Sequence, residues 1–374
     1  MKKYTCLLAV IATLLLSQAL AQLSIPKKAY WHLQGSIGTV VSGMNLVKIN
    51  DSLYGSISFT RNGDEIIFSS FEPGKPLDLS GRMDATGNFQ LRPFGSEYPC
   101  LKGQLLNAVS FKGEFNEGRD KKNLHFDFSE IYKAGSVQFN VYALNQVTAL
   151  VRKQKSPAGK VSMAVLSPME SGNTFVSDSL RKIILKAFDN SGYPGNNPDT
   201  LLARNAGMFS RDYMNANKDL YKQMPEAGAL NWQLLRFMHI VTNENQILCF
   251  YILNYAFSGG AHGLETLDYQ NVNLKTGAVI RLADLMPEGR KSDLSILLTK
   301  KLKQMNSIPS SGKLSENGYF VNEIQPGENF YLTPAGIGFV YNHYDVAPYS
   351  FGATDIFLTA DEVKDILKPF TNGL

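Results

Sequence analysis

Apolar and polar residues alternate with a period of two through the first part of the chain, over residues 28–145. Short runs such as Leu53–Phe59 carry this alternation, and turn-forming residues separate the runs, as at Asn62-Gly63 and around Gly87. This pattern is typical of half-buried β-strands joined by hairpins. We therefore predict an all-β domain over residues 22–150.

A loose repeat of leucine, one intervening residue and glycine runs through the same region. Its glycines recur about once per hairpin, at Gly35, Gly55, Gly81 and Gly103. Since glycine inside a strand often marks a bulge or a tight bend, the repeat predicts a curved antiparallel meander or a small barrel. The alternatives for its role are a ligand-binding barrel and a structural or spacer domain.

The pattern changes at residues 151–160, which are charged, contain proline and glycine, and lack periodicity. We interpret this segment as a linker. Residues 161–374 then mix both periodicities, with a helical part over 161–228. Helices are predicted over 178–188, 199–224 and 293–305, and a capping box at Thr359 and Glu362 predicts the start of a last helix. Strands are predicted over 229–241, 246–257, 264–274, 330–332 and 337–341. Packed helices and antiparallel hairpins predict an α+β fold rather than a doubly wound α/β fold.

The N-terminus has the three-part pattern of a secretory signal peptide over residues 1–21. Lys2 and Lys3 precede an apolar run over 7–16, and small residues at Ala19 and Ala21 stand where a signal peptidase reads the chain. The apolar run is shorter than the ~20 residues that span a bilayer. We expect cleavage before Gln22 and a soluble chain that is periplasmic or secreted.

Charge and cysteine content narrow the class of protein further. The formal net charge is +4, and because two lysines leave with the signal, the mature chain is close to neutral. No basic stripe indicates a nucleic-acid partner, and no second apolar run reaches bilayer length. Cys100 and Cys249 fall in separate predicted domains, so we expect buried free thiols, although an exported compartment permits a disulfide.

Two glycine- and aromatic-rich segments stand out in the second half. Asn254–Gly263 ends in Gly-Gly-Ala-His, and Phe339–Gly352 contains Ala-Pro-Tyr. With the Thr-Gly turn at 276–277 and the Leu-Ala-Asp-Leu segment at 282–285, they resemble in order the PdaC/RsiV-like domain of unknown function. The resemblance covers 229–374, preceded by the family's helical companion segment.

The resemblance implies an α+β fold and a role at the cell envelope. One relative is a membrane anti-sigma factor whose outer domain binds lysozyme. Another relative sits beside a polysaccharide deacetylase domain, which carries the reaction. The resemblance thus implies a non-enzymatic exported protein that binds a protein such as lysozyme or a glycan such as peptidoglycan. It implies no cofactor, and likeness of fold does not transfer activity.

The candidate binding residues lie in these two segments. Glycine lets a partner approach the backbone, and aromatic side chains are favoured at binding hot spots. If the segments meet, their two histidines would approach the carboxylates of Asp345 and Glu265, a combination that binds zinc or transfers protons. The candidates are Gly259, Gly260, His262, Tyr341, His343, Tyr344, Asp345, Pro348 and Tyr349.

No established catalytic motif accompanies these residues. The sequence has no His-x-x-x-His spacing, no Gly-x-Ser-x-Gly elbow and no glycine-rich phosphate loop. We therefore assign no catalytic residue, metal or cofactor. Three functions stay open: an envelope binding protein, an envelope hydrolase with a His262-centred site, and a purely structural accessory module.

Overall fold

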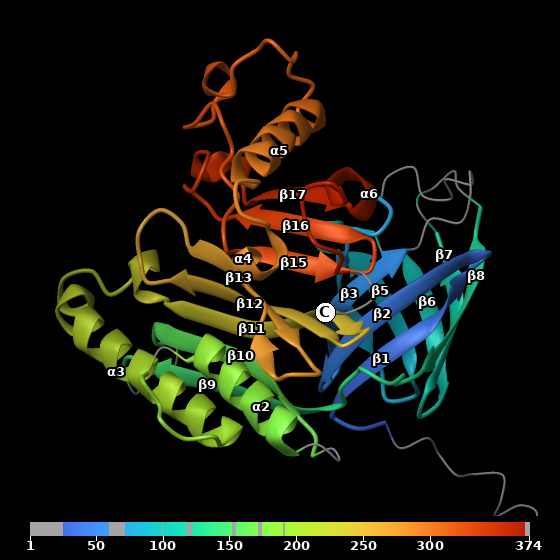
Figure 1. Ribbon diagram of the computed structural model, residues 1–374. Helices are drawn as coiled ribbons and strands as arrows, with labels where there is room; N and C mark the ends of the chain where they lie inside the picture. Colours follow the sequence, from blue (N-terminus) through green and yellow to red (C-terminus); the bar gives the residue numbers. More distant parts are fainter. Residues whose placement is uncertain are drawn as a thin grey trace, which may run out of the picture.

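The computed structural model describes residues 25–59, 72–98, 100–116, 118, 122–151, 155–170, 174–189 and 191–370. The predicted signal peptide and the predicted turn at Asn62-Gly63 lie outside the described residues. The described strands form a closed barrel, a six-stranded sheet and a three-stranded sheet, and helices pack on the two sheets (Figure 1). The predicted α+β architecture, with an antiparallel β part first, is confirmed.

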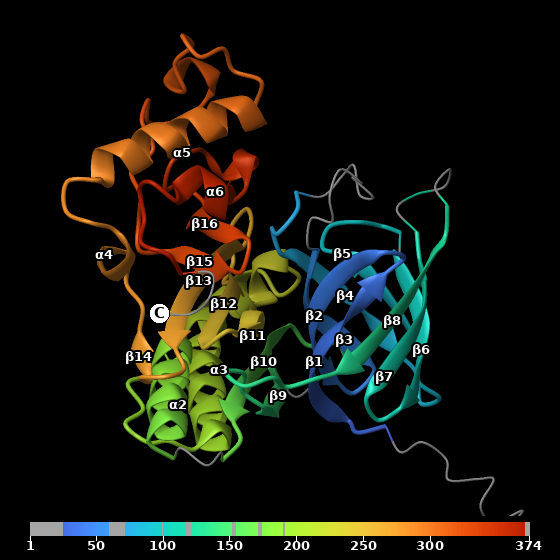
Figure 2. The ribbon, with the colours of Figure 1, turned by 45° about the vertical axis from the view of Figure 1, so that its right-hand side comes forward.

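Antiparallel strands close the N-terminal barrel, which stands beside the rest of the chain (Figure 2). Strand β1 pairs with both β2 and β8, so this sheet has no free edge. Apolar side chains fill the interior, among them Leu33, Phe89 and Phe111. The strands are β1 (Lys28–Ile37), β2 (Val40–Ile49), β3 (Ser52–Phe59), β4 (Leu77–Met83), β5 (Asn88–Pro93), β6 (Leu101–Asn107), β7 (Ser110–Phe115) and β8 (Leu124–Glu130).

The repeated glycines lie where neighbouring barrel strands approach closely. A Cβ atom on Gly55 would stand 1.8 Å from the carbonyl oxygen of Asn45, and one on Gly81 would stand 1.8 Å from that of Gln90. The other two glycines of the repeat have a carbonyl oxygen at 2.0 and 2.3 Å from the same position. The repeat is therefore a requirement of strand packing in the barrel.

The six-stranded sheet has the order β14-β13-β12-β11-β10-β9. Its β10 and β11 are parallel, because helices α2 (Thr174–Phe188) and α3 (Pro198–Gln223) connect them and cover one face of the sheet. The short helix η1 (Gly228–Leu230) precedes β11. The strands are β9 (Phe139–Ala149), β10 (Ala158–Pro168), β11 (Gln233–Glu244), β12 (Ile247–Phe257), β13 (Leu264–Asn273) and β14 (Ala278–Val279).

The predicted linker at 151–160 is instead part of a β-hairpin. Strands β9 and β10 pair along their whole length, from Ala149 opposite Ala158 to Phe139 opposite Pro168. The barrel ends at Glu130, and β9 belongs to the six-stranded sheet although the sequence placed it in the all-β domain. Charge, proline and glycine occur in hairpin connections as well as in linkers, so composition did not separate the two.

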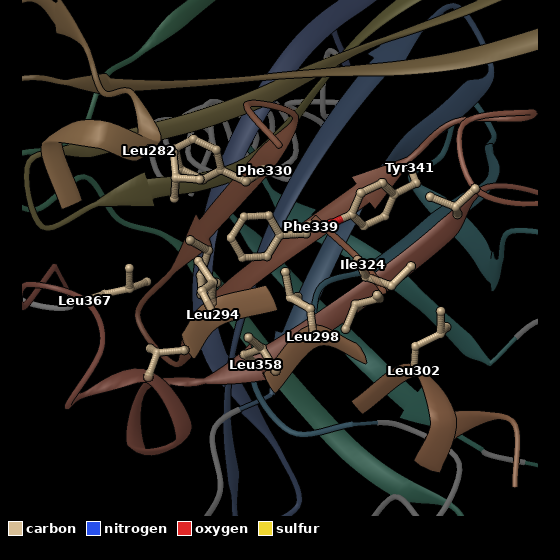
Figure 3. Packing of buried hydrophobic residues seen from close by; sticks show 14 of the residues in the cluster. Leu282, Leu294, Leu298, Leu302, Ile324, Phe330, Phe339, Tyr341, Leu358 and Leu367 are labelled. Carbon is tan, nitrogen blue, oxygen red and sulfur yellow. The ribbon is translucent and has the colours of Figure 1, made fainter. Parts of the chain in front are cut away.

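A three-stranded antiparallel sheet forms the C-terminal part, from β15 (Phe330–Thr333), β16 (Gly336–Tyr341) and β17 (Thr354–Thr359). Figure 3 shows Leu294 and Leu298 of α5 (Lys291–Met305) packed near Phe339 and Leu358 of this sheet. The smaller elements are α4 (Leu282–Leu285), η2 (Ser315–Asn317), η3 (Tyr349–Phe351) and α6 (Ala360–Val363).

The predicted capping box before the last helix is confirmed. The side chain of Thr359 accepts a hydrogen bond from the backbone of Glu362, and the Glu362 carboxylate accepts one from the backbone of Thr359. The helix it starts is short and ends at Val363.

Both cysteines of the described chain are buried free thiols, as expected. Cys100 lies in the barrel core and Cys249 in a cluster between the two sheets. Burial raises the pKa of Cys100 to about 12, so its thiol is unreactive at neutral pH. Within the ranges given above, the structure has no helix that combines the length and apolar character of a membrane span.

Candidate functional site

A cleft of about 850 Å³ lies between the outer surface of the barrel and the six-stranded sheet. Alternate residues of each strand point into it, because successive side chains of a strand face opposite ways. The barrel wall, from β4 and β5, is mainly polar and includes Ser80, Arg82, Gln90 and Arg92. The sheet wall, from β11, β12 and β13, is mainly apolar and includes Leu235, Phe237, Leu253 and Leu267.

Hydrogen bonds between the barrel and β11 hold the two walls in place. The Ser56 hydroxyl donates to the carbonyl oxygen of Ile240 at 2.7 Å, and the Asn45 amide donates to that of Val241 at 3.2 Å. A register shift at this point leaves Val241 without a partner residue in the β11–β12 ladder. The bulge therefore turns backbone acceptors toward the barrel.

Stacked rings line the floor of the cleft. The His239 ring lies 4.6 Å from the Tyr251 ring, nearly parallel to it, and 4.7 Å from the Tyr54 ring. His239 is 8% exposed, and neither its Nδ1 atom nor the Tyr54 hydroxyl has a hydrogen-bond partner among the described residues.

Asp78 lies in the same cleft and accepts a hydrogen bond from the Tyr251 hydroxyl at 2.8 Å. Burial raises the pKa of Asp78 from 3.8 to about 7, against the opposing effect of that hydrogen bond. Burial also raises the pKa of Glu265 and lowers that of His239 to about 3. At neutral pH the floor therefore carries a neutral imidazole and a partly protonated aspartate.

The raised pKa of Asp78 predicts a pH-dependent stability that Asp78→Asn removes. The stabilising contribution of the protonated carboxyl is complete below pH 3.8 and is lost as pH rises through about 7. The shift corresponds to at most about 4 kcal/mol, and we expect about 2 kcal/mol because water enters the cleft. Urea unfolding should show Asp78→Asn more stable than the parent by that amount at pH 8 and equal to it at pH 3.5.

Glu97→Gln is the matched control, since Glu97 lies exposed at the rim of the same cleft. We expect it to leave the pH profile of the parent unchanged. An Asp78→Asn profile parallel to that of the parent would show that burial does not shift the pKa of this carboxyl.

The two segments singled out in the sequence meet beside one end of the cleft. The Tyr349 ring lies 3.9 Å from the His262 ring and 4.4 Å from the His343 ring, each within 21° of parallel. The Tyr349 hydroxyl donates to the carbonyl oxygen of Gly263 at 3.0 Å, and Nδ1 of His262 lies 2.9 Å from the same oxygen. His343 acts electrostatically on Glu265, which lines the cleft.

The two histidines share an aromatic partner, the ring of Tyr349. Each histidine packs a ring face against the Tyr349 ring. The Asp345 carboxylate accepts a hydrogen bond from the backbone of Asn342 at 2.8 Å and closes its own loop. In the described part of the chain, no three His, Cys, Asp or Glu side chains are grouped to hold a metal ion.

Tyr341 lies in the core rather than on the surface. It belongs to β16, is 8% exposed, and donates its hydroxyl to the carbonyl oxygen of Gln325 at 2.8 Å. Its place in an apolar strand makes it part of the core beneath the loop. Tyr344, by contrast, is 50% exposed at the tip of that loop.

The remaining candidates shape the two loops. Gly259 and Gly260 both have positive φ angles, of 89° and 101°, which glycine adopts without strain. Pro348 stands immediately before η3, where its fixed φ starts the short helix that carries Tyr349.

Sequence reasoning missed the cleft itself. Its residues come from strands of both the barrel and the six-stranded sheet, and apart from Tyr255 and Glu265 none of them was singled out in the sequence as part of a possible site. The one available signal is the spacing of Leu235, Phe237 and His239, which puts two apolar side chains and a histidine on one face of a strand.

Comparison with known proteins identifies the C-terminal region. Residues 283–361 match the family described as "Protein of unknown function (DUF3298)". A solved structure of a DUF3298 family member from Bacteroides fragilis NCTC 9343 is 24% identical with a TM-score of 0.59, over 64% of this chain and 96% of that one. A DUF3298 family protein from Pseudomonas aeruginosa PAO1 is 16% identical with a TM-score of 0.46, over 62% and 95%. No curated protein matches the chain.

The likeness to the Bacteroides protein shows a shared fold and transfers no activity. The matched residues contain α5, the three-stranded sheet and the loop of Tyr349, whereas the Gly-Gly-Ala-His segment precedes them. The prediction of a domain of unknown function in the C-terminal half is confirmed. The chain carries a DUF3298 domain, a domain of unknown function, at residues 283–361.

Proposed function

We propose that this protein is an exported cell-envelope protein that binds a glycan in the cleft between the barrel and the six-stranded sheet, without catalysing a reaction on it. The observation that carries the proposal is a cleft of about 850 Å³ with an apolar, partly aromatic sheet wall facing a barrel wall of polar side chains. That volume is typical of small-ligand sites, which are mostly apolar with a few polar groups that orient the ligand.

The difference between the two walls favours a saccharide. A pyranose ring has an apolar C–H face and carries its hydroxyl groups along its edges. The sheet wall offers aromatic rings at Phe237 and Tyr255, against which such a face packs. The barrel wall offers Gln90 and Ser80, whose side chains both donate and accept hydrogen bonds.

Export rests on the signal pattern at residues 1–21, and the absence of catalysis rests on the geometry of the candidate histidines. A His262-centred hydrolase requires a second group beside that imidazole to activate water or a nucleophile. His262 instead stacks on Tyr349 and directs Nδ1 to the carbonyl oxygen of Gly263. The binding proposal therefore has better support than the hydrolase.

A protein ligand such as lysozyme is the second candidate, and a separate surface favours it. Phe320, Tyr344 and Phe351 are 56%, 50% and 45% exposed, and the backbone of Phe320 is hydrogen-bonded to Val346 in the same loop region. Exposed aromatic side chains that lie close together are typical of protein interfaces. This surface does not line the cleft, so variants distinguish the two candidates.

Phe237→Ala is expected to weaken glycan binding at least tenfold, because it removes a ring from the sheet wall of the cleft. Isothermal titration calorimetry of the mature protein with chitotetraose and with soluble peptidoglycan fragments measures this. Phe175→Ala, on an exposed position of α2, is the matched control and should bind as the parent does.

The proposal fails if neither saccharide binds at millimolar concentration. It also fails if Phe237→Ala and Phe175→Ala bind saccharide equally well. Binding of lysozyme that is lost in Tyr344→Ala and kept in Phe237→Ala would establish the second candidate instead.

A further inference from the structure

Two arginines stand at the mouth of the cleft. Arg82 of β4 pairs with Gln90 of β5, and Arg92 of β5 pairs with Ser80 of β4, so the two arginines are diagonal neighbours on the same face of the barrel wall. Both side chains are exposed and line the cleft. Diagonal positions on adjacent strands are within reach of one ligand group, since their separation is about 7–8 Å.

In the part of the chain that the structure describes, neither Arg82 nor Arg92 has an ion-pair partner, whereas two other arginines do. Arg290 pairs with Asp293 at 2.6 Å, and Arg181 pairs with Asp178 at 3.0 Å. A guanidinium group matches the geometry of a carboxylate and binds it through two parallel hydrogen bonds. Two unpaired guanidinium groups at the mouth of a cleft are therefore suited to a negatively charged group on the ligand.

The acidic groups of the cleft do not oppose such a ligand strongly. Asp78 and Glu265 lie in its deeper part, and burial raises the pKa of both, so each takes up a proton more readily than an exposed carboxyl does. Glu97 is the acidic residue at the mouth, where it faces two arginines. The mouth thus has a net positive charge, whereas His239 on the floor is neutral.

We propose that the cleft selects an acidic saccharide, with Arg82 and Arg92 binding its carboxylate at the mouth and with the rings of His239 and Tyr54 packing against it at the floor. This proposal rests on the proposed function and names the ligand class of the same site. The apolar sheet wall between these two ends receives the ring face of the sugar. A neutral saccharide uses only the floor and the sheet wall, so it binds more weakly.

The test compares two disaccharides of N-acetylated sugars that differ only in a lactyl carboxylate on one ring. Calorimetry of the mature protein at 50 mM salt is expected to show the acidic disaccharide bound at least tenfold more tightly than the neutral one. Arg82→Gln and Arg92→Gln are each expected to lower the affinity for the acidic disaccharide five- to tenfold and to leave that for the neutral one unchanged. Arg211→Gln, on an exposed position of α3, is the control.

The outcomes distinguish failure of the acidic preference alone from failure of the proposed glycan site. Equal affinity for the two disaccharides, or an equal effect of the arginine variants on both, overturns the acidic preference while the glycan site stands. Failure of both disaccharides to bind overturns the two proposals together. Arginine-dependent binding of dodecyl phosphate below its micelle concentration, with no saccharide bound, assigns the cleft to an anionic amphiphile and overturns both. Circular dichroism spectra that match the parent establish that the variants are folded.

Discussion

Gly55→Ala is expected to lower the free energy of unfolding by more than about 3 kcal/mol. The added Cβ atom would stand 1.8 Å from the carbonyl oxygen of Asn45 and 2.9 Å from its carbonyl carbon. Both are backbone atoms of β2, and Gly55 lies opposite Leu46 in the β2–β3 ladder. The neighbouring strand cannot move away without breaking ladder hydrogen bonds, so the clash is not relieved by a change of rotamer.

Gly43→Ala is the matched control on the neighbouring strand. Its Cβ atom would meet the side chain of Gln34 at 3.7 Å, which is ordinary van der Waals contact, so we expect a loss below about 1 kcal/mol. Guanidinium chloride unfolding reports both variants through the fluorescence of Trp31, which lies in the barrel core, in a Trp232→Phe background. Equal stability of the two variants would refute the role of the close approach.

The same substitution tests whether the position of the barrel determines the distance between the two walls of the cleft. Asn45 donates a hydrogen bond to the carbonyl oxygen of Val241 in β11, at one end of the cleft. A shift of β2 caused by Gly55→Ala therefore moves the barrel wall relative to the sheet wall. In any folded fraction of this variant, glycan affinity is expected to fall together with stability.

The curvature of the barrel could be predicted from the glycine repeat, because each glycine stands where the neighbouring strand approaches too closely for a Cβ atom. Closure could not, since it depends on the pairing of β1 with β8, which are separated by the whole barrel sequence. The same limit explains the linker error. Whether a charged turn joins two domains or two paired strands depends on β9 meeting β10 over their full length, and no local pattern reports that pairing.

For the candidate site too, the sequence indicates some features, and others depend on how distant parts of the chain pack together. The sequence singles out the two motif segments and leaves open whether they meet, and the structure brings them together by stacking His262 and His343 on Tyr349. The position of the cleft could not be anticipated, because it depends on how the barrel docks on β11. That docking uses the backbone carbonyl groups of Ile240 and Val241 at a bulge. Every residue has a backbone carbonyl group, so the residue types at these positions do not indicate the contact.

Arg236→Met is expected to lower the free energy of unfolding by about 3 kcal/mol. Arg236 is 5% exposed and lies on the face of β11 that packs against the helices, opposite to the cleft. Its guanidinium group donates two hydrogen bonds to the amide oxygen of Asn254, at 3.1 and 3.0 Å, and one to the carbonyl oxygen of Phe188, at 3.1 Å. A further hydrogen bond, at 3.3 Å, reaches the amide oxygen of Asn205 on α3.

One side chain thus joins β12, the C-terminal end of α2 and α3. Methionine fills most of the volume of the arginine stem, but it leaves two buried acceptors and the half-buried amide oxygen of Asn254 without donors. Each buried acceptor left unpaired costs about 1–3 kcal/mol. Urea unfolding followed by far-ultraviolet circular dichroism at the helix band measures the loss. Arg211→Met, on an exposed position of α3, removes an arginine without burying an unpaired acceptor and is expected to change stability by less than about 0.5 kcal/mol. If the two variants were equally stable, water would have to replace the guanidinium group between the helices and the sheet, and the packing of α2 and α3 would not depend on this residue.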